Sequence, residues 1–176
     1  MPVYTYTTID DPSAFTGATV AQGLNDSDQI VGSYRNASGS HGFLDSGGTF
    51  IALDDPSANQ GTFAYGINNA GQVVGYYRDS SNRSHGFLYS GGSYTTIDDP
   101  LGALGTQAFG INNAGQIVGE YVDSSAHRHG FLSIVFLTTR GFTNIDDPFG
   151  TIGTQASGIN GASQIVGELR GPRLSV

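Results

Sequence analysis

The sequence predicts an all-β fold, a small β-propeller with four blades of four antiparallel strands. Two observations predict it. A repeat of 43 or 44 residues runs through the chain of 176 residues, and each copy divides into four short segments rich in β-branched and aromatic residues. Four strands in a repeat of roughly 40–45 residues is typical of propellers. No stretch keeps the apolar period of an amphipathic helix.

The repeat is defined by motifs that recur in one order. Asp-Asp-Pro begins at Asp10, Asp54, Asp98 and Asp146, His-Gly-Phe-Leu begins at His41, His85 and His129, Gly-(Ile/Leu)-Asn begins at Gly23, Gly66, Gly110 and Gly158, and (Ile/Val)-Val-Gly ends at Gly32, Gly75, Gly119 and Gly167. We therefore divide residues 1–176, as one domain, into repeats at about 13–56, 57–100, 101–148, and 149–176 together with 1–12. An insertion of about four residues within 133–144 displaces the last Asp-Asp-Pro.

The second repeat shows the expected strands most clearly, at residues 62–68, 72–78, 85–89 and 93–97. Asn68-Asn69-Ala70-Gly71 and Gly91-Gly92 suit tight hairpins, because glycine adopts positive φ without steric cost. The longer polar loop at 79–84 separates the second and third strands. Pro100 ends the fourth strand, since proline cannot donate to a strand ladder.

The two ends of the sequence predict how the ring closes. Residues 3–9 match only a fourth strand, and the last repeat lacks His-Gly-Phe-Leu and a fourth strand. We expect the N-terminal strand to complete the last blade, because closure removes exposed sheet edges. The rival expectation is self-association of an open half-ring, which makes a homo-oligomer.

Composition and charge limit the partners. The formal net charge is −8 and all seven basic residues are arginine, whereas a nucleic-acid surface needs clustered cations. We therefore expect no nucleic acid, and instead a neutral polar ligand or a cation. The chain has no cysteine, so it forms neither a disulfide nor a thiolate metal site. No apolar run approaches the roughly 18 residues of a membrane-spanning helix.

The combined pattern Gly-Ile-Asn-x-x-Gly-Gln-(Ile/Val)-Val-Gly followed by His-Gly-Phe-Leu resembles the HAF-type repeats of bacterial extracellular proteins. Gly42, Gly86 and Gly130 stand where that family usually has alanine. The resemblance covers nearly the whole chain and implies a secreted or cell-surface protein, its signal peptide absent from this sequence. It implies no catalytic residue.

The acidic loops and histidines are the first candidate site, because alternate loops of a blade share one face and long loops carry function. The candidate ligand-binding residues are Asp55, Asp99, Asp147, His85, His129 and Tyr76. Oxygen-rich acidic loops suit sugar hydroxyls or Ca²⁺, and the candidate metal ligands are Asp54, Asp98 and Asp146. No other cofactor is expected. The competing interpretation is structural: aspartate before proline caps a turn, and a histidine repeated in every blade, His41 included, bonds a loop.

Glu120 and Glu168 are the second candidate site. They are the only glutamates and occupy the same repeat position, directly after (Ile/Val)-Val-Gly. A carboxylate pair on neighbouring blades is suited to acid–base catalysis of glycoside hydrolysis. The alternative is two solvated strand residues.

Three functions follow from these residues. The first is a non-catalytic recognition or scaffold module, lectin-like, that binds carbohydrate or another small polar ligand at equivalent places. The second is a polysaccharide-active hydrolase or lyase with Glu120 and Glu168 in a central funnel. The third is a structural or self-assembling repeat protein.

Overall fold

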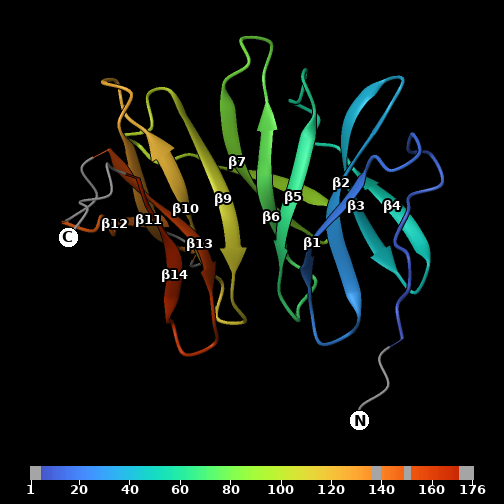
Figure 1. Cartoon of the computed structure of the whole chain (residues 1–176). Helices are drawn as coiled ribbons and strands as arrows, with labels where there is room; N and C mark the ends of the chain where they lie inside the picture. Colours follow the sequence, from blue (N-terminus) through green and yellow to red (C-terminus); the bar gives the residue numbers. More distant parts are fainter. Residues whose placement is uncertain (1–4, 136–139, 149–151, 171–176) are drawn as a thin grey trace, which may run out of the picture.

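The computed structural model describes residues 5–135, 140–148 and 152–170, and its regular structure consists of β-strands (Figure 1). The all-β prediction is confirmed. The strands are β1 (Thr19–Leu24), β2 (Gln29–Asn36), β3 (Gly39–Ser46), β4 (Thr49–Leu53), β5 (Thr62–Ile67), β6 (Val73–Arg78), β7 (Ser84–Ser90), β8 (Ser93–Ile97), β9 (Gly105–Ile111), β10 (Gln116–Val122), β11 (Arg128–Val135), β12 (Arg140–Asn144), β13 (Gly153–Ile159) and β14 (Ile165–Arg170).

Each of the first three repeats forms one antiparallel meander, in which every strand pairs with the next along the chain: β1–β4, β5–β8 and β9–β12. The last repeat contributes the hairpin β13–β14. The β-branched and aromatic segments of the second repeat became strands within two residues of the expected ends, and β8 matches 93–97 at both ends.

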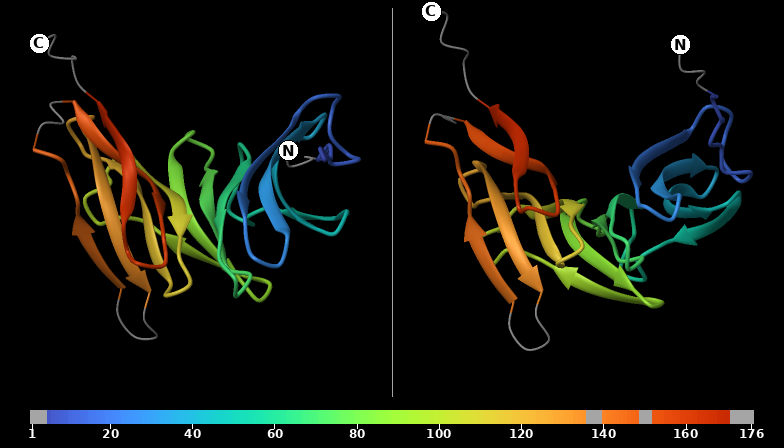
Figure 2. Two further views of the ribbon diagram at one scale, coloured as in Figure 1. Left: turned by 60° about the horizontal axis from the view of Figure 1, so that its bottom comes forward. Right: turned by 90° about the horizontal axis from the view of Figure 1, so that it is seen from below.

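The meanders assemble into two sheets. β1–β4 form a four-stranded antiparallel sheet, and the other ten strands form one curled, mixed sheet. The mixed sheet is joined by two short parallel contacts, Ser84 opposite Gly105 between β7 and β9, and Arg128 opposite Gly153 between β11 and β13. Figures 1 and 2 show an open arc, with the first sheet and β14 at opposite ends.

The prediction of four four-stranded blades closed into a ring is therefore wrong. Residues 5–11 form no strand, and residues 7–10 line a cavity with Ile30 and Phe50 of the first repeat. The physical reason lies in strand pairing. Each fourth strand pairs with a third strand, as β4 does with β3 and β8 with β7, and the last repeat has no His-Gly-Phe-Leu segment. The N-terminal segment thus has no ladder to join beside β14.

The apolar core lies between consecutive repeats. One cluster joins the first and second repeats, and another joins the second and third. The first contains Val31, Leu53, Ala64, Ile67, Val73, Tyr77 and Phe87, and the second contains Val74, Leu88, Ile97, Ala108, Ile111, Ile117, Tyr121 and Phe131. A repeat therefore buries part of its apolar surface against its neighbours, as in other repeat proteins.

In the first three repeats, the glycine at the end of the (Ile/Val)-Val-Gly motif makes room for a phenylalanine ring. A Cβ atom at Gly75 would lie 2.0 Å from the Phe63 carbonyl oxygen and 2.9 Å from the ring of Phe87. Phe87 comes from the His-Gly-Phe-Leu motif and is fully buried. The two motifs recur together because the ring of one covers the backbone of the other.

A row of asparagines also joins the repeats. The side-chain amide of Asn25 donates to the Asn68 carbonyl oxygen at 3.1 Å, that of Asn68 to Asn112 at 3.2 Å, and that of Asn112 to Asn160 at 3.0 Å. The amide oxygen of each also accepts backbone N–H groups of its own turn, as Asn68 does from Ala70 and Gln72. The Gly-(Ile/Leu)-Asn motif thus both shapes a hairpin and fixes the next repeat.

Candidate functional site

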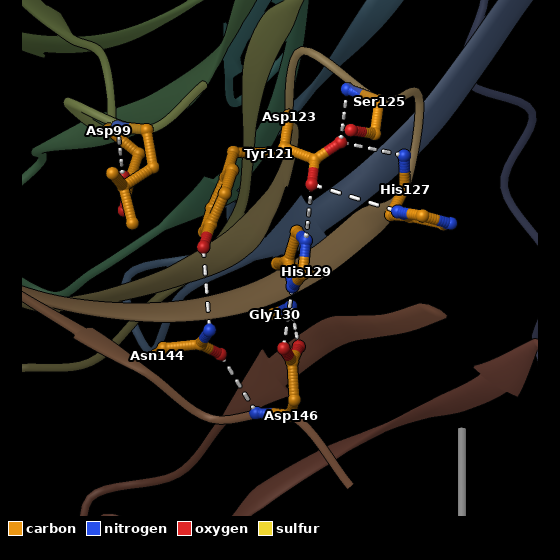
Figure 3. A network of polar contacts seen from close by, with 10 residues as sticks. Asp99, Tyr121, Asp123, Ser125, His127, His129, Gly130, Asn144 and Asp146 are labelled. Carbon is orange, nitrogen blue, oxygen red and sulfur yellow. Dashed lines mark hydrogen bonds and ion pairs between the residues drawn. The ribbon is translucent and has the colours of Figure 1, made fainter. Parts of the chain in front are cut away.

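In the third repeat His129 holds the start of the third strand to the end of the fourth (Figure 3). Its Nδ1 lies 2.6 Å from Asp146 Oδ2, and its Nε2 lies 3.3 Å from Asp123 Oδ2. Asp146 also accepts the Gly130 N–H at 3.0 Å. The ring of Tyr121 stacks on the imidazole, with the two centroids 4.8 Å apart. His129 and Asp146 are therefore brought together, as the binding interpretation requires, although their bonds also tie strands together.

The second repeat has the same arrangement. His85 Nδ1 lies 2.7 Å from Asp98 Oδ2, and Nε2 lies 3.3 Å from Asp79 Oδ2. Tyr77 stacks on this imidazole at 5.1 Å. Asp79 and Asp123 were missing from the sequence-based site. Their position six residues before each of these histidines was the available signal.

The first repeat differs at one partner. His41 Nδ1 lies 2.9 Å from Asp54 Oδ2, and Tyr34 stacks on the ring at 5.1 Å. Its Nε2, however, faces the Ser38 hydroxyl at 2.9 Å and the Asn36 amide oxygen at 3.2 Å, where later repeats have a carboxylate. The first site therefore carries less negative charge than the other two.

Electrostatics follow from these contacts. Partial burial by itself lowers the pKa of His129, but the hydrogen bonds and charges of Asp146 and Asp123 outweigh it, so the pKa lies above its usual value. The backbone N–H of His127 is the main cause that holds the pKa of Asp123 below its usual range. The backbone N–H of Arg83 does the same for the pKa of Asp79.

The second aspartate of each pair has a different environment. The Asp55 N–H donates to Thr62 Oγ1 at 3.0 Å, and its carboxylate accepts the Ser57 N–H at 2.8 Å. Asp99 has the equivalent bonds, and the Asp147 N–H donates to Thr154 Oγ1. Burial raises the pKa of Asp99, against the N–H of Leu101. These are the bonds that a turn cap makes.

A polar hollow of about 240 Å³ lies between the first and second repeats, and we call it the first-junction hollow. It brings the candidates Asp54 and Asp55 together with His41, the hydroxyls of two serines and a threonine, and an asparagine. Its lining residues are Ser38, Ser40, His41, Asp54, Asp55, Ala58, Asn59, Gly61 and Thr62.

The loop that lines this hollow differs from its counterpart in the second repeat in length and in sequence. The segment between Tyr34 and His41 is one residue shorter than that between Tyr77 and His85. The longer loop includes Arg83, whose guanidinium donates to the Gly102 carbonyl oxygen at 2.7 Å. Gly102 is the counterpart of Ala58 in the hollow, so an arginine lies at the second junction where the first is open. The loop difference was the sequence signal for this site.

Tyr76 belongs to another cluster. Its ring is nearly buried and stacks on Phe63 at 4.9 Å and on Tyr65 at 5.7 Å. The Arg78 guanidinium lies over both Phe63 and Tyr76. Tyr65 in turn contacts Phe109 edge-on at 5.1 Å. The cluster joins β5, β6 and β9 and contains none of the candidate aspartates or histidines.

Glu120 and Glu168 lie near each other, with arginines between them. Glu120 is 2% exposed and accepts a hydrogen bond from Arg128. Arg170 Nη2 lies 4.0 Å from Glu120 Oε2, and its Nε donates to Glu168 Oε1 at 2.8 Å. Burial raises the pKa of Glu120 above its usual value, because it outweighs the charges of Arg128 and Arg170.

A raised pKa suits a proton donor, but the Glu120 carboxylate is buried and already paired with Arg128 and Arg170. The guanidinium of Arg170 bridges the two carboxylates, which is the arrangement of a structural ion-pair network. We therefore derive no catalytic step from Glu120 and Glu168.

Within residues 5–135, 140–148 and 152–170, no group of three or more histidines and carboxylates is arranged to hold a metal ion. No helix in that part of the chain is long and apolar enough to cross a membrane. Fold and site together define an all-β repeat protein with polar inter-repeat junctions. Neither protein-family models nor curated protein sequences give a match to this chain.

Proposed function

We propose that the chain is a non-catalytic recognition module that binds a small neutral polar ligand, such as one residue of a carbohydrate, in the first-junction hollow. The observation that carries this proposal is the hollow itself, about 240 Å³ in volume and lined by carboxylate, imidazole, amide and hydroxyl groups. In keeping with the resemblance to HAF-type repeats, we place the module outside the cell.

The chemistry of the lining favours sugar hydroxyls. Each sugar hydroxyl both donates and accepts, and the hollow offers the acceptor carboxylate of Asp54 beside the hydroxyls of Ser38 and Ser40 and the amide of Asn59. The Asp54 side chain is 46% exposed, so a ligand reaches it without rearrangement of the backbone. The net charge of −8 disfavours anionic ligands.

Rigidity supports the same proposal. Asp54 is fixed through His41, and His41 is fixed by Tyr34 and by Ser38. A ligand therefore meets oriented groups, and little side-chain entropy is lost on binding. The equivalent histidines in later repeats hold the same positions, but at the second junction Arg83 already bonds a loop carbonyl.

The test is a loop graft. Wild-type protein is screened on a glycan array, and hits are titrated by calorimetry and by NMR of backbone amides. We expect amide shifts centred on residues 36–41 and 54–62. Replacing residues 36–40 by residues 79–84 brings an arginine into the hollow, and binding should be lost while the melting temperature stays near that of the wild type.

Asp54→Asn keeps the shape of the hollow and should weaken binding at least tenfold, because an amide loses one acceptor oxygen. Asp98→Asn, at the second junction, is the matched control and should leave affinity unchanged. Absence of binding to any glycan, or equal binding by the loop graft, would contradict the proposal.

A further inference from the structure

A cavity of about 310 Å³ lies at the C-terminal end of the arc, against β13 and β14, and we call it the terminal socket. Its apolar lining comes from positions that elsewhere form the core. The lining residues are Ile145, Asp147, Thr154, Gln155, Ala156, Ile165, Gly167, Glu168 and Leu169.

At the equivalent positions of the earlier repeats, these lining residues pack in a cluster that contains a phenylalanine. Where the first repeat meets the second, the positions equivalent to Ile145, Ala156, Ile165 and Leu169 belong to the same buried cluster as Phe87; these equivalents are Leu53, Ala64, Val73 and Tyr77. Where the second repeat meets the third, the equivalent positions, Ile97, Ala108, Ile117 and Tyr121, belong to the same buried cluster as Phe131. The terminal socket thus has the lining that receives a phenylalanine of the Gly-Phe-Leu type.

The surroundings of Gly167 differ from those of the equivalent glycines in the earlier repeats. A Cβ atom at Gly32, Gly75 or Gly119 would lie 2.8–2.9 Å from a phenylalanine ring carbon. At Gly167 the nearest atoms are backbone atoms of Gln155 and Ala156. The strand therefore has the glycine that a ring needs, with no ring on it in the described part of the chain.

The strand β14, which lines the terminal socket, is also an edge strand. In the sheet formed by the described residues, β14 pairs with β13 alone. Val166 and Leu169 are 68% and 51% exposed, whereas their counterparts Val118 and Tyr121 are 0% and 2% exposed. An open edge with an apolar face is the surface to which an extended segment adds as a strand.

We propose that the edge of β14 and the terminal socket bind an extended Gly-Phe-Leu segment supplied by another polypeptide, which adds as an antiparallel strand. The proposed strand pairing has the same form as three pairings within the chain, between β2 and β3, β6 and β7, and β10 and β11.

The existing pairs fix the register of the added strand. In the third repeat Phe131 lies opposite Gly119, Leu132 opposite Val118, and Gly130 opposite Glu120. The bound segment therefore places its phenylalanine opposite Gly167 and its leucine opposite Val166. A second copy of this chain offers no such segment without unfolding, because β3, β7 and β11 are each paired on both sides.

The experiment uses the whole chain and a synthetic peptide of residues 83–97, which carries the third and fourth strands of the second repeat. We expect 1:1 binding by calorimetry and hydrogen-exchange protection of the amides of 165–170. The peptide with Phe87→Ala should bind at least tenfold more weakly, because it leaves the terminal socket empty.

On the protein, Leu169→Asp should abolish binding, and Leu101→Asp, at a similarly exposed leucine in a loop (64% exposed), is the matched control. The unbound chain is also examined by analytical ultracentrifugation. Equal binding of the two peptides, protection confined to the first repeat, or no binding would overturn the proposal. Self-association that Leu169→Asp removes would assign the face to a second copy and would also overturn it.

Discussion

The third and fourth repeats carry the same motif in opposite environments. Val118 in β10 is fully buried, and Val166, its counterpart in β14, is 68% exposed. β10 lies between β9 and β11, whereas β14 has β13 beside it and a cavity where the third strand of earlier repeats packs. Whether a motif residue is buried therefore depends on the strands beside it and not on the sequence of its own repeat. A linear array of repeats, in which each repeat contacts only the next, behaves in this way.

The glycines of the Gly-(Ile/Leu)-Asn motif show the same contrast. A Cβ atom at Gly110 would lie 3.1 Å from the Cα of Gly158 in the next repeat, whereas at Gly158 the nearest atom within 4 Å is Cγ2 of Val166 in its own hairpin. Stability should accordingly fall from the middle of the arc towards β14. The following substitutions test this gradient.

The largest effect is expected from Phe131→Ala. Phe131 is fully buried over Gly119, so loss of the ring should cost about 3–5 kcal/mol of unfolding free energy. Urea unfolding followed by circular dichroism measures it. Leu169→Ala in the terminal socket is the comparison and should cost less than about 1 kcal/mol. Similar losses for the two variants would mean that the fourth repeat is packed as tightly as the third.

A matched valine pair sharpens the comparison. Val118→Ala removes two buried methyl groups and should cost about 2 kcal/mol. Val166→Ala removes the same groups from an exposed position and should change stability by less than about 0.5 kcal/mol. Saturating the protein with the Gly-Phe-Leu peptide should raise the cost of Val166→Ala towards that of Val118→Ala. An unchanged cost would mean that the bound peptide does not cover Val166.

Much of the fold could be predicted from sequence, because local patterns encode it. Residues 93–97 became β8 with both ends as expected, and the glycine turns separated the strands. The open form of the arc could not be predicted in this way, because closure of a ring depends on pairing between distant segments. Tyr6-Thr7-Thr8-Ile9 repeats the sequence of residues 94–97, but β7, the neighbour that makes residues 94–97 a strand, has no equivalent beside β14 among the described residues.

The candidate site divides in the same way. The association of His129 with Asp146 follows from motif order, whereas the partner Asp123 lies in a loop that the motifs do not cover. The first-junction hollow lies where the first repeat has Gly39 and the second has Arg83, a difference between repeats that a search for what they share overlooks. Arg170, which lies between Glu120 and Glu168, belongs to the last described strand and to no motif.

The asparagine row gives a third comparison. Asn68 is 3% exposed and links two repeats through the Asn112 carbonyl oxygen. Among the described residues, the Asn160 side chain bonds only within its own turn, to Gln164 and to the N–H groups of Ala162 and Gln164. Both alanine variants lose the turn bonds, so Asn68→Ala should cost about 1 kcal/mol more than Asn160→Ala, the typical net value of one hydrogen bond. Thermal unfolding measures the difference, and equal costs would show that the row does not couple the repeats.

The smallest effect is expected from pH, at His129. Its pKa is higher in the folded state than the usual value of about 6.5, so its protonation stabilises the fold. That stabilisation is fully present below the unfolded pKa and is lost as the pH rises through the folded one. Between about pH 5 and pH 9 the difference in unfolding free energy between wild type and His129→Gln should therefore shrink as pH rises. Asp123→Asn removes one acceptor and should lower the pKa of His129, measured by NMR titration of the imidazole. A difference that does not vary with pH would mean that His129 acts only through neutral hydrogen bonds and ring stacking.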